Sequence, residues 1–322
     1  MSKPAVIRVI DPGMLTTVQD LGRVGWSGIG VGRGGAADTL SLRVGNRLVG
    51  NDDGAAAFEM TLVGGTFEFE RDATIVLSGG AVTAQIIGRR DKRPAAEWKP
   101  FKIRSGEKLV TGPIRSGVRS YLCVSGGIDV PQRLGSRSTH LVGAFGGLKG
   151  RALRSGDLLE VGGETGRIGD SHLAAAARAY CESRLSRRSV RAVDGPHLNT
   201  FDFQAIERLW TTSFKVSVQS DRTGMRLKGR LGPSTLGGRM PSEGMMPGAV
   251  QVPASGEPIV LMVDYPTTGG YPVIACVAAV DLPVLGQVRP RQTLRFERVS
   301  LAESRSLFAE QEQSLNAEVP PP

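Results

Sequence analysis

Glycine and proline punctuate this chain so often that long helices have little room to form. The 322 residues include 43 glycines and 19 prolines, while aromatic residues make up only 5%. Glycine and proline are turn residues, and chains rich in both favour many short strands joined by tight turns. An all-α fold is therefore disfavoured, and a mainly β fold is predicted.

The first half of the chain alternates short apolar segments with turn signals. One helix stands out over residues 39–48, where Leu40, Val44 and Leu48 recur at helical spacing behind an N-cap at Asp38. The flanking segments show strand periodicity and glycine-containing breaks. The predicted strands cover residues 5–10, 16–18, 66–70, 74–77, 82–87 and 118–124.

The composition changes near the middle of the chain, and this change predicts a domain boundary. Residues 173–188 contain helix formers without glycine or proline, which predicts one helix. From Val190 the strand and turn pattern resumes, interrupted by a short helix over 200–210. We expect two tandem β domains, 1–188 and 189–322. The tail from Ala302 begins as a helix and ends in three prolines, so we expect it to fray.

Charge and hydropathy restrict the partners of the chain. The longest apolar stretch, Val273–Val280, is far below the roughly 18 residues needed to cross a bilayer, so no membrane span is predicted. The N-terminus has no apolar core of a secretory signal, which favours the cytoplasm. The net charge is +9, but the basic residues are scattered without interleaved aromatics. A solvated basic surface, or one facing acidic partner subunits, explains the charge better than nucleic-acid binding.

The cysteines and histidines do not form a recognisable metal or disulfide pattern. Cys123, Cys181 and Cys276 lie far apart and are odd in number, and the histidines have no ligand spacing. Cys123 and Cys276 sit in apolar segments, where a thiol is usually a small core side chain. No metal site is predicted.

Six segments of the chain, in order, resemble one protein family. They are residues 12–25 (PGMLTTVQDLGRVG), 34–51 (GGAADTLSLRVGNRLVGN), 121–139 (YLCVSGGIDVPQRLGSRST), 220–229 (SDRTGMRLKG), 241–262 (PSEGMMPGAVQVPASGEPIVLM) and 267–275 (TTGGYPVIA). They are similar to the family that includes the C subunit of 5-oxoprolinase, KipA, allophanate hydrolase subunit 2 and the carboxyltransferase domain of urea carboxylase. The resemblance implies two tandem cyclophilin-like β-barrel domains with a few short helices.

The resemblance also implies partners and a reaction. Family members work with a B-type, KipI-like subunit and, in 5-oxoprolinase, with a LamB/YcsF-like A subunit. There the complex couples ATP hydrolysis to the opening of a small cyclic amide, 5-oxoproline, into glutamate. The chain has no GxxxxGK[ST] phosphate loop and no Met-Lys-Met biotin attachment site. ATP chemistry would therefore belong to a partner, and any biotin would be supplied in trans.

Two positions depart from the family pattern. Pro266 stands where the family usually has a glutamine before the TTGGYP segment, and His197 replaces the glutamine of a Gly-Pro-Gln sequence. Losing the first glutamine removes an amide donor and acceptor that could have served a substrate.

A candidate site follows from the chemistry of these segments. Opening or carboxylating an amide develops negative charge on a carbonyl oxygen, which threonine hydroxyls and backbone N–H groups of a Gly-Gly turn could stabilise. The guanidinium of Arg222 could hold a carboxylate, and Asp221 could orient it or act as a base. The predicted catalytic residues are Asp221, Arg222, Thr267 and Thr268, and the predicted substrate-binding residues are Gln251, Gly269, Gly270, Tyr271, Gln19, Asp20, Arg23, Ser136, Arg137 and Ser138.

A purely structural interpretation of the same residues remains open. The TTGGYP segment is also good turn chemistry, an Asp-Arg pair can fasten one loop to another, and the GSRST loop suits turn capping as well as anion binding.

Three functions are compatible with the sequence. The first is the C component of an ATP-dependent 5-oxoprolinase, nearly inactive when isolated. The second is carboxyl transfer from biotin to urea or a related amide. The third is a KipA-type regulatory protein that binds and antagonises a kinase inhibitor.

Overall fold

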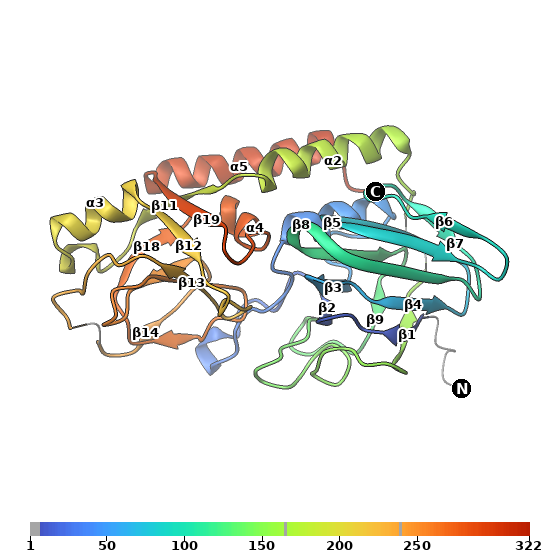
Figure 1. Ribbon diagram of the computed structural model, residues 1–322, viewed down its shortest axis with the longest axis horizontal. Coiled ribbons are helices and arrows are strands. Elements are labelled where there is room, and N and C mark those ends of the chain that lie inside the picture. The colour runs from blue at the N-terminus through green and yellow to red at the C-terminus, as the bar shows by residue number, and fades with distance from the viewer. Residues whose placement is uncertain (1–6, 164–165, 238–239) are drawn as a thin grey trace. The chain divides into compact units, whose positions relative to one another are not determined.

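The computed structural model describes residues 7–163, 166–237 and 240–322. The chain divides into two compact units (Figure 1). The first comprises the described parts of Met1–Arg23, Gly34–Ser183 and Leu315–Pro322, and the second comprises Val24–Arg33 and Arg184–Ser314. The division falls inside two helices, α2 (Ser171–Leu185) and α5 (Leu301–Glu318). The mainly β character expected from glycine and proline is confirmed.

Within the described residues, the first unit is built on a ten-stranded sheet. The order along its main path is β2-β3-β8-β4-β1-β10-β9, and β5 pairs with β6, β7 and β8. Apolar side chains of these strands, including Phe58, Phe67 and Leu122, form one fully buried core. The strands are β1 (Ile7–Asp11), β2 (Thr16–Gln19), β3 (Ala57–Thr61), β4 (Thr66–Phe69), β5 (Ala73–Ile87), β6 (Lys92–Pro94), β7 (Phe101–Ile103), β8 (Lys108–Val124), β9 (Ile128–Asp129) and β10 (Leu158–Val161).

Two long strands dominate this sheet. β5 and β8 pair antiparallel along most of their length, and their register shifts at several points between Gly79 and Ala84. The sequence predicted separate strands at 74–77 and 82–87, which is wrong because the chain continues through the glycines as one bulged strand. Gly79 adopts a φ of 92°, a conformation that glycine reaches at little cost and that accommodates such an irregularity.

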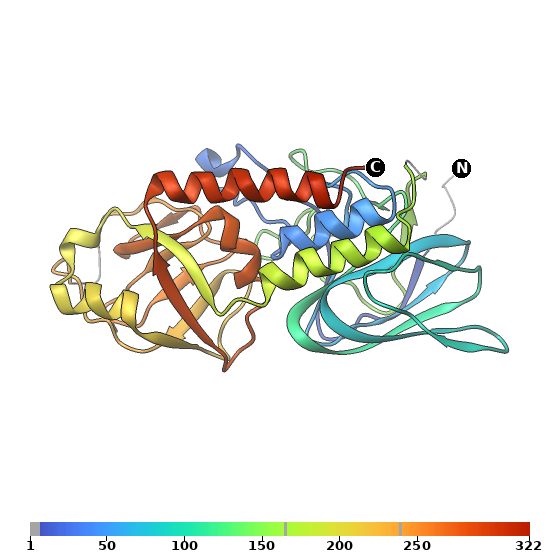
Figure 2. The same cartoon turned by 90° about the horizontal axis from the view of Figure 1, so that it is seen from above.

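Helix α1 (Thr39–Leu48) was predicted with its cap, and both are confirmed. The Asp38 carboxylate accepts a hydrogen bond of 3.0 Å from the Ser41 N–H. The helix lies against β5 and β8, as Figure 2 shows from above. Gly45 faces these strands so closely that a Cβ there would lie 2.5 Å from the Ser78 Oγ and 2.8 Å from the Cys123 Sγ.

The second unit contains a closed barrel. Its strands follow the order β11-β18-β15-β16-β13-β12-β19, and a separate two-stranded ribbon pairs β14 with β17. The barrel interior is filled by apolar residues such as Phe214, Val260 and Phe296. The strands are β11 (Ser189–Asp194), β12 (Ser213–Val216), β13 (Gly224–Lys228), β14 (Glu243–Gly244), β15 (Ala249–Gln251), β16 (Ile259–Leu261), β17 (Thr268–Gly269), β18 (Val273–Val277) and β19 (Thr293–Arg298).

Apart from its part of α5, the described helices of the second unit are short. The helix predicted over 200–210 is α3 (Phe203–Thr211), which Asp202 caps by accepting from the Ala205 N–H at 2.6 Å. A second helix, α4, covers Leu282–Leu285, and 3-10 turns lie at Ser27–Ile29, Leu198–Thr200 and Ala279–Asp281. No helix in the described part of the chain is both long and apolar enough to span a membrane.

The C-terminal tail was expected to fray, and this expectation is wrong. α5 is followed by Val319, which is fully buried, as is Leu315. The Arg47 guanidinium donates to the Val319 carbonyl oxygen and also forms an ion pair with Asp53 at 2.6 Å. A buried arginine thus fastens the tail to the first unit, a contact between residues that are remote in sequence. The helix predicted over 173–188 ends at Leu185, before β11 begins.

The close approach of α1 to the sheet predicts that Gly45→Ala destabilises the protein. Alanine favours a helix over glycine by about 1 kcal/mol. The clash with two buried side chains should outweigh this gain and lower the free energy of unfolding by about 1–3 kcal/mol. Urea unfolding measures the change. Gly54→Ala is the control, because its Cβ would meet only an ordinary contact at 3.8 Å; equal effects of the two substitutions would contradict the interpretation.

Candidate functional site

The predicted site residues of the first unit form a buried polar network at the end of β2. The Asp20 carboxylate accepts hydrogen bonds from the Ser136 hydroxyl at 2.6 Å, from the Ser138 hydroxyl, and from the Arg137 N–H at 2.5 Å. The Gly22 N–H donates to the same carboxylate at 2.7 Å. Both serine hydroxyls are therefore already committed to a carboxylate, an arrangement that anchors their loop.

Arg23 and Gln19 extend the same network. The Arg23 guanidinium donates to the Ser138 carbonyl oxygen at 2.5 Å and lies 4.8 Å from the centre of the Phe145 ring. Gln19 is fully buried and donates to the Thr17 hydroxyl and the Thr139 carbonyl oxygen at 3.0 and 3.3 Å. The structure thus brings all six predicted residues of the first unit together, mostly away from solvent.

In the second unit, Arg222 is held by a residue that sequence reasoning missed. Its guanidinium makes two hydrogen bonds to the Asp264 carboxylate, of 2.7 and 3.1 Å, and both residues are only 5% exposed. Backbone bonds reinforce the link, because the Asp264 N–H donates to the Arg222 carbonyl oxygen at 2.9 Å. Asp264, rather than the neighbouring Asp221, orients this arginine, and its carboxylate occupies the fork that was expected to hold a substrate.

Asp221 lies on the surface of the same turn. Its Oδ1 accepts from the N–H groups of Thr223 and Gly224 at 2.8 and 3.0 Å, which is an Asx turn. The Arg222–Asp264 pair connects this turn to the segment that leads into Thr267. The Asp221 and Thr267 loops are therefore joined within one unit.

The side chain of Gln251 packs directly against Gly269, which belongs to the β14–β17 ribbon. A Cβ on Gly269 would lie 2.6 Å from the Gln251 Nε2, so only a glycine leaves room for this buried amide. The ribbon pairs Thr268 with Gly244, and the Thr267 carbonyl oxygen accepts from the Met245 N–H at 2.9 Å. Thr268 is exposed and Gly269 and Gly270 are half-buried, so this segment is accessible from solvent.

His197, noted as a departure from the family pattern, connects this ribbon to the barrel. Its Nδ1 accepts from the Val273 N–H at 3.0 Å, so in the neutral ring the proton resides on Nε2. Nε2 lies 3.4 Å from the Glu243 carboxylate of β14. Glu243 in turn pairs with Gly269 across the ribbon. The histidine therefore helps to position the segment that carries Thr268 and Gly269.

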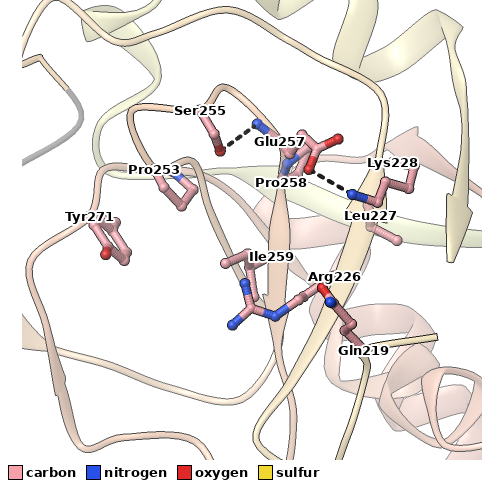
Figure 3. A pocket seen from close by; sticks show the side chains of 10 residues that line it. All are labelled: Gln219, Arg226, Leu227, Lys228, Pro253, Ser255, Glu257, Pro258, Ile259 and Tyr271. Atoms are coloured by element: carbon pink, nitrogen blue, oxygen red, sulfur yellow. Dashed lines mark hydrogen bonds and ion pairs between the residues drawn. The ribbon is translucent and has the colours of Figure 1, made fainter. Parts of the chain in front are cut away.

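Tyr271, at the end of the TTGGYP segment, lines a pocket on the second unit (Figure 3). The pocket has a volume of about 220 Å³ and lies between the outer face of β13 and the loop before β16. Its other lining residues, which no sequence signal singled out, are Gln219, Arg226, Leu227, Lys228, Pro253, Ser255, Glu257, Pro258 and Ile259.

Cys123 is fully buried, and Cys276 is partly buried against a small apolar cluster, so both pack as small apolar side chains, as predicted. Burial raises the pKa of the Cys123 thiol to about 12, which disfavours the thiolate. Burial also raises the pKa of Cys276, which packs behind the ribbon against Met245 and Tyr265. Across residues 7–163, 166–237 and 240–322, no group of three or more His, Cys, Asp or Glu side chains is arranged to hold a metal ion.

These features define a two-unit β protein with an accessible polar ribbon on a closed barrel. The family model described as "Carboxyltransferase domain, subdomain A and B" matches residues 29–298. The chain belongs to this carboxyltransferase family, which confirms the resemblance found in the sequence.

Similar proteins of known name fall into two groups. The chain is 40% identical over 308 residues to the C subunit of 5-oxoprolinase from Escherichia coli strain K12, covering 96% of this chain and 95% of that protein. It is 35% identical to the C subunit of 5-oxoprolinase from Haemophilus influenzae, covering 94% of each. The crystal structure of Kluyveromyces lactis urea carboxylase matches 98% of this chain at 30% identity with a TM-score of 0.86.

The second group consists of much longer proteins. The K. lactis urea amidolyase structure matches with a TM-score of 0.85 and 30% identity, but this chain spans only 20% of it. The corresponding share of the urea carboxylase is 29%. These structures support the fold of this chain, which spans less than a third of either protein.

The buried Arg222–Asp264 pair predicts a large cost for Asp264→Asn. Removing one charge of a buried pair leaves the other uncompensated, which should lower the free energy of unfolding by roughly 3–5 kcal/mol. Chemical denaturation measures the loss. Glu297→Gln breaks an exposed ion pair of the same unit, with Arg187, and should change little. Similar effects of the two substitutions would contradict a special role for the buried pair.

The contact between Gly269 and Gln251 predicts a functional effect for Gly269→Ala. The added methyl must displace the Gln251 amide, and misplacement of a binding group by about 1 Å can reduce a rate by up to about a hundredfold. Gly244→Ala on the paired strand is the matched control, because its Cβ would meet nothing within 4 Å. The activity of the assembled complex is the readout. Equal activities of the two variants would show that the Gln251 position does not matter.

Proposed function

We propose that this chain is the C component of an ATP-dependent 5-oxoprolinase, which opens 5-oxoproline to glutamate together with A and B subunits. The observation that carries the proposal is the length of the match to the C subunit of the E. coli 5-oxoprolinase, which covers 96% of this chain and 95% of that protein. A match that is nearly complete in both directions favours the role of that C subunit.

The chemistry of the ribbon supports catalysis at an amide. Attack of water on the lactam carbonyl of 5-oxoproline develops negative charge on its oxygen before the ring C–N bond breaks. In the proposed site the hydroxyls of Thr267 and Thr268, the backbone N–H group of Gly270 and the Gln251 amide donate hydrogen bonds to this region of the substrate. Tyr271 and Gln251 would contact the ring.

The roles of the charged residues differ from one another. Arg222 is a positioning residue in this proposal, because its guanidinium is occupied by Asp264. Asp221 is exposed, and only its Oδ1 is used by the turn. Its second oxygen could therefore act as a base toward the attacking water. The network around Asp20, with Arg23, Ser136, Arg137 and Ser138, serves mainly to hold the first unit's loop.

ATP and the other subunits complete the proposed reaction. The sequence contains no phosphate loop, so ATP would bind to a LamB/YcsF-like A subunit or a KipI-like B subunit. The γ-phosphoryl group of ATP passes to a second water, which leaves ADP and phosphate, and the free energy of this hydrolysis drives the opening of the ring. The chain alone should be nearly inactive.

Carboxyl transfer from biotin to urea or a related amide is the second candidate. It is favoured by the TM-score of 0.86 to the K. lactis urea carboxylase over 98% of this chain. The same oxyanion-stabilising donors would serve this reaction, with biotin carried by a partner. The two candidate activities differ in the cofactor that they need. Carboxyl transfer requires carboxylated biotin, whereas oxoprolinase activity does not.

Reconstitution tests the proposal. The purified chain, combined with A and B subunits from its own genome, should release glutamate from 5-oxoproline only when ATP is present. Activity of this chain alone, or the absence of activity in the full mixture, would contradict the proposal. Biotin-dependent carboxylation of urea by the mixture would establish the second candidate. Tight binding to the B subunit without turnover of any amide would favour a KipA-type regulator.

Asp221→Asn tests the base within the same assay. Asparagine retains a side-chain oxygen that can accept from the Thr223 and Gly224 N–H groups, but it cannot take up a proton. If Asp221 is the base, the kcat of the complex should fall by at least about a hundredfold while the melting temperature is almost unchanged. Asp221→Ala removes both the hydrogen-bond acceptor of the turn and the base, so it should also lower the stability of the protein. Full activity of the Asn variant would limit Asp221 to its turn.

A further inference from the structure

The pocket beside Tyr271 contains an arginine that the protein itself does not neutralise. Along β13, Met225 and Leu227 point into the core, with exposed fractions of 4% and 1%, so the alternating Arg226 and Lys228 face outward. In the described part of the chain, the Arg226 side chain has no hydrogen bond or ion pair; only its backbone N–H and carbonyl groups are engaged. Its guanidinium is therefore available to a ligand.

The other charges of the pocket balance one another. Lys228 forms an ion pair with Glu257 at 3.2 Å, and the Glu257 N–H is bonded to the Ser255 hydroxyl at 3.4 Å (Figure 3). This pair leaves Arg226 as the one uncompensated charge among the described lining residues. A ligand with a single negative charge would neutralise the pocket, whereas a dianion would leave one negative charge without a partner in the pocket.

The remaining lining residues of the pocket suit a small ligand that is partly apolar. Ile259, Pro253 and the Tyr271 ring supply apolar surface, while Gln219 offers an amide. Figure 3 shows the Arg226 guanidinium next to the Ile259 side chain, on the side of the pocket toward Tyr271. The volume of about 220 Å³ accommodates a compact molecule but not a nucleotide or a long chain. The planar guanidinium matches the geometry of a carboxylate, which it can bind through two parallel hydrogen bonds.

We propose that this pocket binds the carboxylate of a small monocarboxylate ligand through Arg226, with Tyr271 and Ile259 against the body of the ligand. If the proposed function holds, on which this identification of the ligand rests, that carboxylate is the one of 5-oxoproline. Tyr271 belongs both to the pocket and to the segment of Thr267 and Thr268. Urea has no carboxylate and would gain nothing from Arg226.

Calorimetric titration of the full chain, alone and in the assembled complex, tests the proposal with three probes. L-5-oxoproline carries the lactam and the carboxylate, cyclopentanecarboxylate carries only the carboxylate, and 2-pyrrolidinone carries only the lactam. Both carboxylates should bind, and Arg226→Gln should weaken both by at least about tenfold, as expected for loss of a charge-assisted pair. The same substitution should not alter the weak binding of 2-pyrrolidinone.

Lys215→Gln is the matched control. Lys215 pairs with Lys228 in the neighbouring strand but does not line the pocket. Its substitution therefore removes one positive charge, as Arg226→Gln does, but leaves the Arg226 guanidinium in place. Its carboxylate affinities should fall by much less than those of Arg226→Gln, since an exposed lysine outside the lining acts on the ligand only through solvent and salt. Equal losses in both variants would overturn the proposal, because they would indicate a general charge effect.

The outcomes separate this proposal from the proposed function. If the complex hydrolyses 5-oxoproline but Arg226→Gln binds it as tightly as the wild type, the pocket proposal fails and the function stands. If the complex releases no glutamate but cyclopentanecarboxylate binds in an Arg226-dependent manner, the pocket proposal stands and its ligand is another monocarboxylate. Binding of 2-pyrrolidinone as tight as that of 5-oxoproline would overturn the proposal directly.

Discussion

The buried ion pair between Arg222 and Asp264 is the interaction on which the geometry of the second unit's site depends. Two charges that are almost completely removed from water are tolerated only when each satisfies the other, so the pair fixes two loops in one arrangement. One loop carries Asp221 and leads into β13, and the other leads through Thr267 into the ribbon. The pair thus adds a link between the turn of Asp221 and the segment of Thr267 to the local hydrogen bonds that each of them makes.

The first unit also holds a buried carboxylate in place, but with different hydrogen-bond donors. Asp20 follows β2 and is only 7% exposed, yet its carboxylate is satisfied by two serine hydroxyls and two backbone N–H groups rather than by an arginine. Arg23 of the same segment instead bonds a backbone carbonyl oxygen and packs on Phe145. A carboxylate bonded in this way fastens a loop and has its acceptor positions already in use, which is why the catalytic proposal rests on the second unit.

Local signals in the sequence predicted the parts of the structure that depend on neighbouring residues. Helix α1 and its Asp38 cap follow from a few adjacent side chains, and the residues of the TTGGYP segment are consecutive and necessarily lie together. The contacts that sequence reasoning missed join distant residues. Arg222 and Asp264 are 42 positions apart, and Arg47 reaches a carbonyl oxygen 272 positions away. Nothing local indicates that a proline-rich tail will be anchored by a buried arginine.

The two arginines of the SDRTGMRL segment show how strand geometry separates structural from binding roles. Arg222 precedes β13 and turns inward to Asp264, whereas Arg226 lies on the strand at a position that alternation directs outward. A sequence pattern gives both the same chemistry, and only the fold decides which guanidinium remains available. Donors that polarise an amide carbonyl serve urea and 5-oxoproline equally, because both substrates present that group. A charged residue beside those donors can distinguish them, since only one of the two substrates carries a carboxylate. Substrate choice within this carboxyltransferase family would then depend on residues that line the pocket beside Tyr271, such as Arg226, rather than on the ribbon itself.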